Sequence, residues 1–346
     1  MTLRVAFDMT FPNRNPAGSG VYANELLSEL TRRDDVAITT IATRKGGLPH
    51  TMGWLTDGAR RAAAGAQLLH CPAFVAPWRP GLPFVLTVHD MSTEKFPEDH
   101  PIEWRTYTSL FLPGRARAAA RVITGTEYSR SEIVRDLGLQ AEQVAVTPYG
   151  VAERFSRYKP VTVVAETPLL LFPGAPTRRK NLDLVLRALS EAQASVLRRA
   201  RLVISGATAA QFPHHLERIK ALGLESRVEW LGKVPAEKMP SLISGADLVV
   251  YPSLHEGFGF PALEAMAAGT PVLASNAACL PEVLGDGALM VEPTDVDAFI
   301  KSAEAILERT DVRAMLIERG RARAAQFTWR RCAELTVEVY RQAAAS

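Results

Sequence analysis

The 346-residue chain has little cysteine, no long apolar run and almost no excess of charge. Its three cysteines, Cys71, Cys279 and Cys332, are widely separated and fit no metal-ligand spacing, so we expect free thiols in a reducing cytoplasm. No apolar run reaches the roughly 18–20 residues of a membrane-spanning helix, and the N-terminus lacks the pattern of a secretory signal. The net charge of +3 is too small for nucleic-acid binding but is compatible with anionic ligands or an anionic membrane surface.

The composition that remains is typical of a folded protein, with 47% hydrophobic and 22% charged residues, and the length suffices for two domains. Short apolar or β-branched runs alternate with longer amphipathic runs, which predicts a mainly parallel α/β fold made of two successive doubly wound units. The predicted strands are Leu3–Asp8, Ile38–Ala42, Leu68–His70, Phe84–Val88, Arg121–Thr124, Val144–Thr147, Leu169–Phe172, Arg201–Ser205, Arg227–Leu231, Leu248–Tyr251, Val272–Ala274 and Ala288–Val291. The predicted helices are Val21–Arg32, Trp104–Ala119, Ser129–Asp136, Leu182–Ala192, His215–Leu222, Ala236–Ser244, Pro261–Ala268 and Val296–Glu308.

A stretch without helical period, Ala152–Pro168, contains two prolines and is a predicted linker between the two units. Open α/β sheets bind ligands at the carboxyl ends of their strands. We therefore expect two Rossmann-like domains that face one another across a ligand-binding cleft.

The segment His255–Glu264, HEGFGFPALE, lies between a predicted strand and a predicted helix that begins near Pro261. Glycines in such a loop allow a ligand to approach the backbone, and the amides of a helix start favour phosphate. Carboxylates at Glu256 and Glu264, the latter expected in the first helical turn, are suited to sugar or ribose hydroxyls. The alternative for Glu264 alone is an acid favoured by the helix dipole.

These two glutamates, with seven residues between them, resemble the E-x7-E motif of retaining GT-B glycosyltransferases of family 4. The resemblance continues through AMAAGTPVLASNAACLPEVLGDGALMVEP. It implies that Glu256 contacts the transferred sugar, that Glu264 contacts the nucleotide ribose, and that the intervening loop holds the sugar or phosphates of the donor. The predicted loop residues are Gly257, Phe258, Gly259 and Phe260.

A second candidate site is the basic pair Arg179-Lys180, which follows a predicted strand and precedes a predicted helix. Two cations there could neutralise a diphosphate and stabilise it as a leaving group. A solvated pair is the alternative. The segment resembles the family's G-x-x-x-x-R-K-N block, whose cations bind phosphate. Many members carry arginine directly after the glycine, whereas Ala175 follows Gly174 here.

The third candidate, His89-Asp90, ends a predicted strand, where a histidine could bond a sugar hydroxyl or stabilise developing charge. A histidine satisfied in the domain interior is the alternative. The run TVHDMSTEKFPEDH resembles the family's T-x-HD segment, which implies that His89 lines the donor-sugar pocket. Asp90 is expected to hold the loop or the histidine ring.

The fourth candidate, Gly18-Ser19-Gly20, formally fits a dinucleotide-binding fingerprint. The preceding loop from Thr10 is too long for that tight turn, and the second strand leads into Arg44-Lys45 instead of an acid. The segment resembles the family's N-terminal glycine loop, which implies that its amides lie near the donor phosphate and the acceptor.

Two segments are amphipathic. A stripe with interspersed arginines could form a surface for a lipid-linked acceptor, or could be a helix packed on its own sheet; it comprises Trp104, Tyr107, Leu110 and Phe111 with Arg105, Arg115, Arg117 and Arg121. The tail FTWRRCAELTVEVYRQ has helical period, and the resemblance implies a last helix that packs back towards the N-terminal domain.

Taken together, the sequence predicts three regions: an acceptor-side domain (1–160), a nucleotide-sugar-binding domain (161–326) and a C-terminal helix (327–346). The resemblance implies retaining transfer of a hexose to a glycan or lipid-linked acceptor. The RKN and HD segments are similar to those of mannosyltransferases of bacterial polysaccharide assembly, so GDP-mannose is favoured ahead of UDP-glucose or UDP-GlcNAc as the donor. No obligatory metal and no nucleic-acid partner are expected, and the protein is expected to be cytoplasmic, with a possible contact to the inner membrane surface. The alternatives are phosphorolysis on the same scaffold, or a nucleotide-binding or NAD(P)-dependent protein that transfers no sugar.

Overall fold

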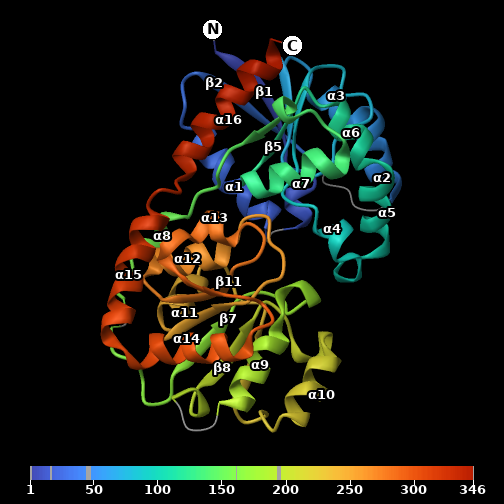
Figure 1. The fold of residues 1–346 in the computed structure, drawn as a ribbon. Coiled ribbons are helices and arrows are strands. Elements are labelled where there is room, and N and C mark those ends of the chain that lie inside the picture. Colours follow the sequence, from blue (N-terminus) through green and yellow to red (C-terminus); the bar gives the residue numbers. More distant parts are fainter. Residues whose placement is uncertain (1, 16–17, 44–47, 161, 193–195, 346) are drawn as a thin grey trace. The chain divides into compact units, whose positions relative to one another are not determined.

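The computed structural model describes residues 2–15, 18–43, 48–160, 162–192 and 196–345, which form two compact units (Figure 1). The first unit combines Met1–Gly150 with Phe327–Ser346, and the second is Val151–Gln326. The chain therefore leaves the first unit at Gly150, whereas the sequence placed this boundary at residue 160.

The first unit contains a six-stranded parallel sheet with the order β2-β1-β3-β4-β5-β6. Strands β3 and β4 are buried along their whole length, as expected where helices cover both faces of a sheet. The strand order reverses between β1 and β3, which makes their carboxyl ends the expected ligand-binding edge. The strands are β1 (Leu3–Asp8), β2 (Val36–Ile41), β3 (Leu68–Cys71), β4 (Phe84–Thr87), β5 (Arg121–Thr124) and β6 (Val144–Val146).

The helices of the first unit include one from the far end of the chain, α16, which packs on α1 and on β3, β4 and β5. They are α1 (Ser19–Leu30), α2 (Leu48–Gly53), α3 (Ala59–Ala62), α4 (Ser92–Lys95), α5 (Ile102–Leu110), α6 (Leu112–Ala118), α7 (Glu127–Leu137) and α16 (Trp329–Ala344). A π-helical turn, Trp54–Gly58, joins α2 to α3.

The single helix predicted over Trp104–Ala119 is wrong, because α5 ends at Leu110 and α6 begins at Leu112. Pro113 lies in the first turn of α6. Proline has no backbone N–H and its ring clashes with the preceding turn, so it is tolerated at a helix start but not in a helix interior.

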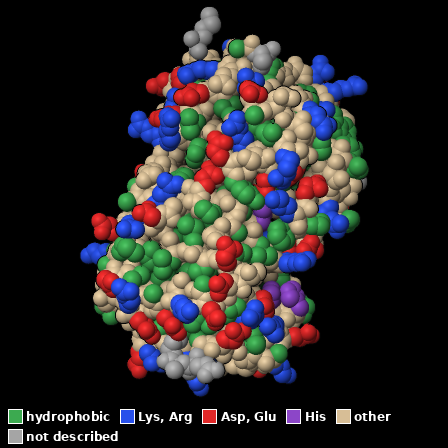
Figure 2. All heavy atoms as spheres, viewed as in Figure 1, with side chains coloured by type: hydrophobic (Ala, Val, Ile, Leu, Met, Phe, Trp, Pro, Cys, Tyr) green, Lys and Arg blue, Asp and Glu red, His purple; other side chains and the backbone are tan. Residues whose placement is uncertain are grey.

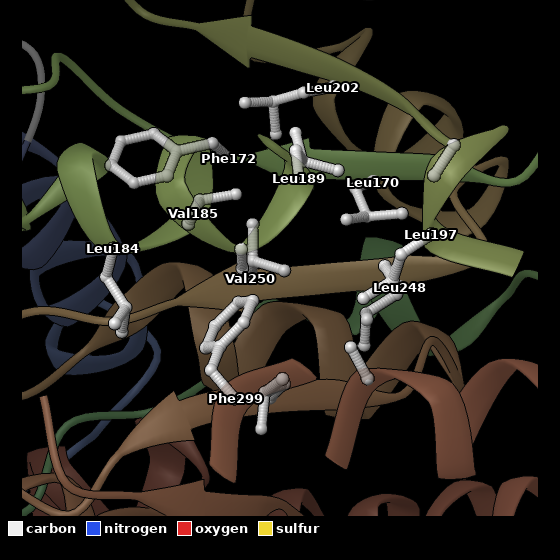
Figure 3. Close-up of a cluster of buried hydrophobic side chains, with 14 of the residues drawn as sticks. Leu170, Phe172, Leu184, Val185, Leu189, Leu197, Leu202, Leu248, Val250 and Phe299 are labelled. Carbon is white, nitrogen blue, oxygen red and sulfur yellow. The ribbon is translucent and has the colours of Figure 1, made fainter. Parts of the chain in front are cut away.

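The second unit contains another six-stranded parallel sheet, with the order β12-β11-β10-β7-β8-β9. Its order reverses between β7 and β10. The core between this sheet and its helices consists of aliphatic side chains and phenylalanines such as Phe172 and Phe299 (Figure 3). The strands are β7 (Leu169–Phe172), β8 (Arg201–Ser205), β9 (Val228–Gly232), β10 (Leu248–Tyr251), β11 (Val272–Ser275) and β12 (Leu289–Val291).

One long helix of the second unit, α15, was not predicted. Its charged residues interrupt any apolar stripe, and Arg313, which is 2% exposed, donates to the carbonyl of Asp247 at 2.7 Å. The helices are α8 (Glu153–Ser156), α9 (Leu182–Glu191), α10 (Pro213–Ala221), α11 (Met239–Ser244), α12 (Phe260–Ala268), α13 (Leu280–Leu284), α14 (Val296–Glu308) and α15 (Thr310–Ala324).

All three cysteines are buried free thiols. Within the described part of the chain, none of the helices combines the length and the apolar character needed to cross a membrane.

Candidate active site

The reversal of strand order in the second unit brings two distant loops together. The loop after β7 ends in a 3₁₀ turn, Arg178–Lys180, and the loop after β10 carries His255 and Glu256. Because β7 and β10 are neighbours in the sheet, their carboxyl ends lie side by side. This is the edge where open α/β sheets bind ligands.

The two loops meet in a cluster of three charged side chains. Lys180 Nζ donates to Glu256 Oε1 at 2.5 Å and to the Tyr251 hydroxyl at 2.8 Å. Arg179 Nη1 donates to Glu256 Oε2 at 3.0 Å and to the His255 carbonyl at 3.1 Å. Both carboxylate oxygens of Glu256 therefore contact a cation.

Glu256 is 7% exposed and Lys180 is 9% exposed, so the cluster is largely shielded from water. Burial by itself raises the pKa of Glu256, but the charges of Lys180 and Arg179 outweigh it and bring the pKa to about 2. Burial and the Glu256 carboxylate raise the pKa of Tyr251 well above its usual value. At neutral pH the cluster thus holds two cations, one carboxylate and a neutral phenol.

Backbone contacts fix the two loops to one another. Leu254 N donates to the Arg179 carbonyl at 2.7 Å. Asn181 has a left-handed backbone with φ of 57°, and its side-chain amide donates to the carbonyls of Pro252 and Pro293 at 3.1 and 2.8 Å. The cation pair consequently rests on a braced loop.

Helix α12 starts directly beyond Glu256, with Gly259 as its N-cap residue at φ of 90° and Pro261 in the first turn. This φ is one that residues with a side chain rarely adopt, so the backbone favours glycine there, and a Cβ would also lie 2.8 Å from Leu280 Cδ2. The start of a helix favours bound anions. The first turn contains no acid, so the prediction that Glu264 lies in it is wrong, and this half-buried residue belongs to the second turn.

Glycines with positive φ lie at or just beyond the carboxyl ends of three adjacent strands, β7, β8 and β9. These are Gly174 at 99°, Gly206 at 94° and Gly232 at 68°. A Cβ on Gly206 would lie 2.9 Å from Gly174 Cα, and Gly206 N donates to the Gly232 carbonyl at 2.7 Å. The loops therefore approach one another backbone to backbone beside the charged cluster.

In the first unit, His89 lies just beyond β4, at the carboxyl end of the sheet. Its Nδ1 lies 2.8 Å from the hydroxyl oxygen of Tyr149. Burial lowers the pKa of His89 to about 4, against the opposing influence of Asp90, so the ring is neutral at pH 7. Asp90 Oδ1 accepts the amide of Ser92 at 2.9 Å and holds the loop.

The segment Gly18-Ser19-Gly20 forms the start of α1, with Gly18 as the N-cap residue at φ of 42°. A Cβ on Gly20 would lie 2.3 Å from the carbonyl oxygen of Asn15, so the path of the preceding loop requires glycine. Arg44 and Lys45, which stand where a dinucleotide-binding fingerprint would have an acid, lie outside the described residues.

Comparison with known proteins identifies the family. Residues 156–323 match the family described as glycosyl transferases group 1, and residues 16–155 match glycosyltransferase family 4. The chain is 33% identical over 285 residues to the O-antigen chain mannosyltransferase B of Escherichia coli, which covers 79% of this chain and 74% of that protein. The chain belongs to glycosyltransferase family 4.

A second relative of this glycosyltransferase is the MMP alpha-(1->4)-mannosyltransferase of Mycolicibacterium hassiacum, 31% identical over 77% of this chain and 66% of that protein. Sucrose-phosphate synthase of Thermosynechococcus elongatus has the same fold, with a TM-score of 0.80, 22% identity and 99% and 100% of the two chains covered. Anabaena HepE, solved with UDP and glucose, has a TM-score of 0.78 and 19% sequence identity to this chain. The match covers 98% of this chain and 99% of HepE. The predicted GT-B fold is confirmed.

The structure of the glycosyltransferase brings Arg179, Lys180 and Glu256 together and places the α12 start beside them. His89 and Gly18-Ser19-Gly20 belong to the other unit. The sequence analysis did not identify two tyrosines that contact these residues, namely Tyr251 beside Lys180 and Tyr149 beside His89. Tyr251 ends its strand and Tyr149 lies shortly after β6, and a phenol near the carboxyl end of a parallel strand is the signal that could have indicated them.

Proposed function

We propose that this glycosyltransferase transfers mannose from GDP-mannose to a glycan or lipid-linked acceptor, with retention of anomeric configuration. The observation that carries the proposal is the cluster of Arg179, Lys180 and Glu256 at the reversal of strand order. Two cations beside a helix start suit a diphosphate, and a carboxylate next to them suits a sugar hydroxyl.

The donor would lie along the loop and start of α12. Arg179 and Lys180 would neutralise the diphosphate, while Gly257, Phe258, Gly259 and Phe260 would line the sugar and phosphates. Glu264 would accept hydrogen bonds from the ribose. We assign Gly18, Ser19 and Gly20 to the phosphate and acceptor side, and His89 to a sugar hydroxyl.

Retention is what the family resemblance implies, and the surroundings of Glu256 distinguish two retaining routes in this proposal. The pKa of Glu256 is about 2, which makes it a poor base, and both of its oxygens are bonded to cations, so attack by Glu256 on the sugar would require an ion pair to break. The acceptor oxygen would instead attack the anomeric carbon on the face that the diphosphate leaves. The carbon–oxygen bond to phosphate breaks, the new glycosidic bond forms, and the acceptor proton passes to a phosphate oxygen. A glycosyl-enzyme trapped on Glu256 would overturn this route.

Protein cations take the role of phosphate counter-charge in this proposal, so no obligatory metal is assigned. Donor binding should be undiminished by EDTA. The mannosyl assignment is supported by the names of the two relatives, both of which are mannosyltransferases.

Ligand-induced thermal shift tests the donor class, because a ligand that binds only the folded state raises Tm. We expect GDP to raise Tm more than UDP, ADP or NADP, and Arg179→Gln with Lys180→Gln to abolish the shift. Stabilisation by NADP alone would favour the alternative of an NAD(P)-dependent protein. A larger shift with UDP than with GDP would show that the donor is a UDP-sugar and not GDP-mannose.

A lipid-linked acceptor would require a membrane contact, and one edge of the first unit suits it. Four large hydrophobic side chains of α2 and α5–α6 are exposed, namely Met52, Ile102, Leu110 and Phe111. An apolar cavity of about 290 Å³ is lined by other residues of α2 and α5, among them Thr51, Trp104 and Tyr107. Helices α5 and α6 carry two exposed arginines, Arg105 and Arg117, and one exposed acid, Glu103. Three more exposed arginines lie in α3 and in the loop before β4, namely Arg60, Arg61 and Arg79. In Figure 2, hydrophobic side chains follow this edge with basic side chains beside them.

Sedimentation with vesicles tests this contact. We expect binding to vesicles of phosphatidylcholine with phosphatidylglycerol, weakened by salt and weak on phosphatidylcholine alone. Ile102→Ser with Leu110→Ser should reduce binding about tenfold through lost apolar burial. The matched control is Val163→Ser, an exposed apolar residue of the second unit. An equal loss in the control would show that the edge has no special role.

A further inference from the structure

Three aromatic rings enclose the His89 imidazole, each in an edge-on arrangement. The ring centroids of Tyr22, Phe74 and Tyr149 lie 5.0, 5.3 and 5.7 Å from that of His89. Phe74 reaches the ring from a backbone with φ of 53°, a conformation that non-glycine residues rarely adopt. Strained backbone of this kind persists where the surroundings fix it, and it is concentrated at functional sites.

The Tyr149 ring is itself held from several sides. It is 1% exposed and stacks on the Trp329 ring at 6.3 Å and 10°. A Cβ on Gly125 would lie 2.8 Å from the Tyr149 ring, so a larger residue there would displace the ring. The phenol oxygen is thereby placed 2.8 Å from His89 Nδ1.

The direction of the bond between these side chains depends on which imidazole nitrogen carries the hydrogen. A buried phenol keeps its proton at neutral pH and donates it to an acceptor. In a neutral imidazole one ring nitrogen accepts and the other carries hydrogen. If the Tyr149 hydroxyl donates to Nδ1, the hydrogen of His89 lies on Nε2. The Nε2 atom is buried and forms no hydrogen bond of ordinary geometry with a described residue, but the Pro72 backbone carbonyl acts as an acceptor for the imidazole and raises its pKa against the effect of burial.

We infer that Tyr149 is a positioning residue that fixes His89 in its Nε2–H tautomer and in one ring orientation, ready to donate to a sugar hydroxyl. This inference rests on the proposed contact of His89 with the sugar. It gives His89 the role of a neutral donor that recognises a hydroxyl, not that of a cation or a proton-transfer acid.

The surroundings of His89 agree with a neutral ring. The titratable groups that face it are Asp90, Tyr22, Tyr149 and the buried His70. Burial outweighs the Asp90 carboxylate in setting the pKa of His89. Tyr22 directs its hydroxyl elsewhere, to Thr87 Oγ1 at 3.2 Å, so Tyr149 is the phenol that sets the tautomer.

The same unit contains a matched control. Tyr340 is 0% exposed, and its hydroxyl lies 2.6 Å from Nδ1 of His70, a buried histidine whose other nitrogen contacts Thr87. Tyr149→Phe and Tyr340→Phe each remove one buried phenol–imidazole bond. Only the first removes it from His89.

The experiment measures GDP release from GDP-mannose and the ¹⁵N signals of the histidine rings in the full chain. Tyr149→Phe should lower kcat/KM about tenfold, the value of one ordinary hydrogen bond. It should also convert the His89 signals from one tautomer to a mixture and leave GDP affinity unchanged. Tyr340→Phe should change the signals of His70 but not kcat/KM.

A double variant separates a positioning role from a general loss of structure. Tyr149→Phe in a His89→Ala background should lower kcat/KM no further, because Tyr149 acts through the histidine. Additive losses, or His89 signals that Tyr149→Phe leaves unchanged, would overturn the inference. Full activity of His89→Ala alone would overturn the sugar contact, whereas the tautomer measurement tests Tyr149 even if the donor is not GDP-mannose.

Discussion

At the scale of single residues, the structure adds most to the role that the sequence predicted for Glu256. Its motif predicted a contact with the sugar, and the structure adds that both of its oxygens hold the cations expected to bind phosphate. The motif spacing identified these residues, but Arg179 and Lys180 lie more than 70 positions from Glu256. Pairing between them depends on the sheet order, which local sequence does not contain.

Glu256→Gln should therefore weaken the fold as well as transfer. The amide leaves two largely buried cations without their counter-charge, which we expect to cost about 2–3 kcal/mol of unfolding free energy. Denaturant unfolding measures it, with Glu191→Gln as the control, because the Arg187–Glu191 pair is exposed. The control should cost less than about 0.5 kcal/mol. Equal effects would mean that the buried cluster contributes nothing special.

The same carboxylate makes stability depend on pH. The pKa of Glu256 is about 2 in the folded chain and near 4.5 when unperturbed, so the unfolded chain binds the proton more readily. The contribution of Glu256 should be complete above about pH 4.5 and should be lost as the pH falls towards 2. Unfolding midpoints of wild type and Glu256→Gln should converge over this range. A constant difference between them would contradict the pairing.

At the scale of elements, sequence periodicity located the buried strands well, because parallel strands covered on both faces are short, continuous apolar runs. Helix α14 has the bounds that its apolar stripe predicts. The prediction failed where the pattern was interrupted. Pro113 divides one expected helix into α5 and α6, and the charged helix α15 shows no stripe at all.

The glycine loops beside the site yield an element-scale prediction. Gly206→Ala should cost about 2–4 kcal/mol, from left-handed strain and from collision with the Gly174 backbone. Gly223 also has positive φ, but a Cβ there meets nothing within 4 Å, so Gly223→Ala should cost only about 1 kcal/mol. Thermal unfolding compares the two variants. If they are equally destabilised, the close approach of the two loops is wrong.

At the scale of the whole molecule, the chain returns to its first unit after completing the second. Helix α16 buries large side chains in the first unit, among them Trp329, Val337 and Tyr340. Only the family resemblance predicted this return, because periodicity reveals that a segment is helical but not which unit it covers.

Removal of residues 327–346 should unfold the first unit selectively. The lost burial amounts to several kcal/mol, at about 1.5–3 kcal/mol for each large side chain, which is comparable with the stability of a whole domain. Hydrogen exchange should then show rapid exchange in β1–β6 and retained protection in β7–β12. Protection of both sheets in the truncated chain would show that α16 is dispensable.

The central claim, that the second unit holds a nucleoside-diphosphate sugar on the Arg179–Lys180–Glu256 cluster, is tested most directly by calorimetric titration of the full chain with GDP-mannose. We predict one site per chain, unaffected by EDTA, and a loss of affinity of at least tenfold in Lys180→Gln. Unchanged affinity in Lys180→Gln, or binding of NADP in place of any nucleoside diphosphate, would contradict the account.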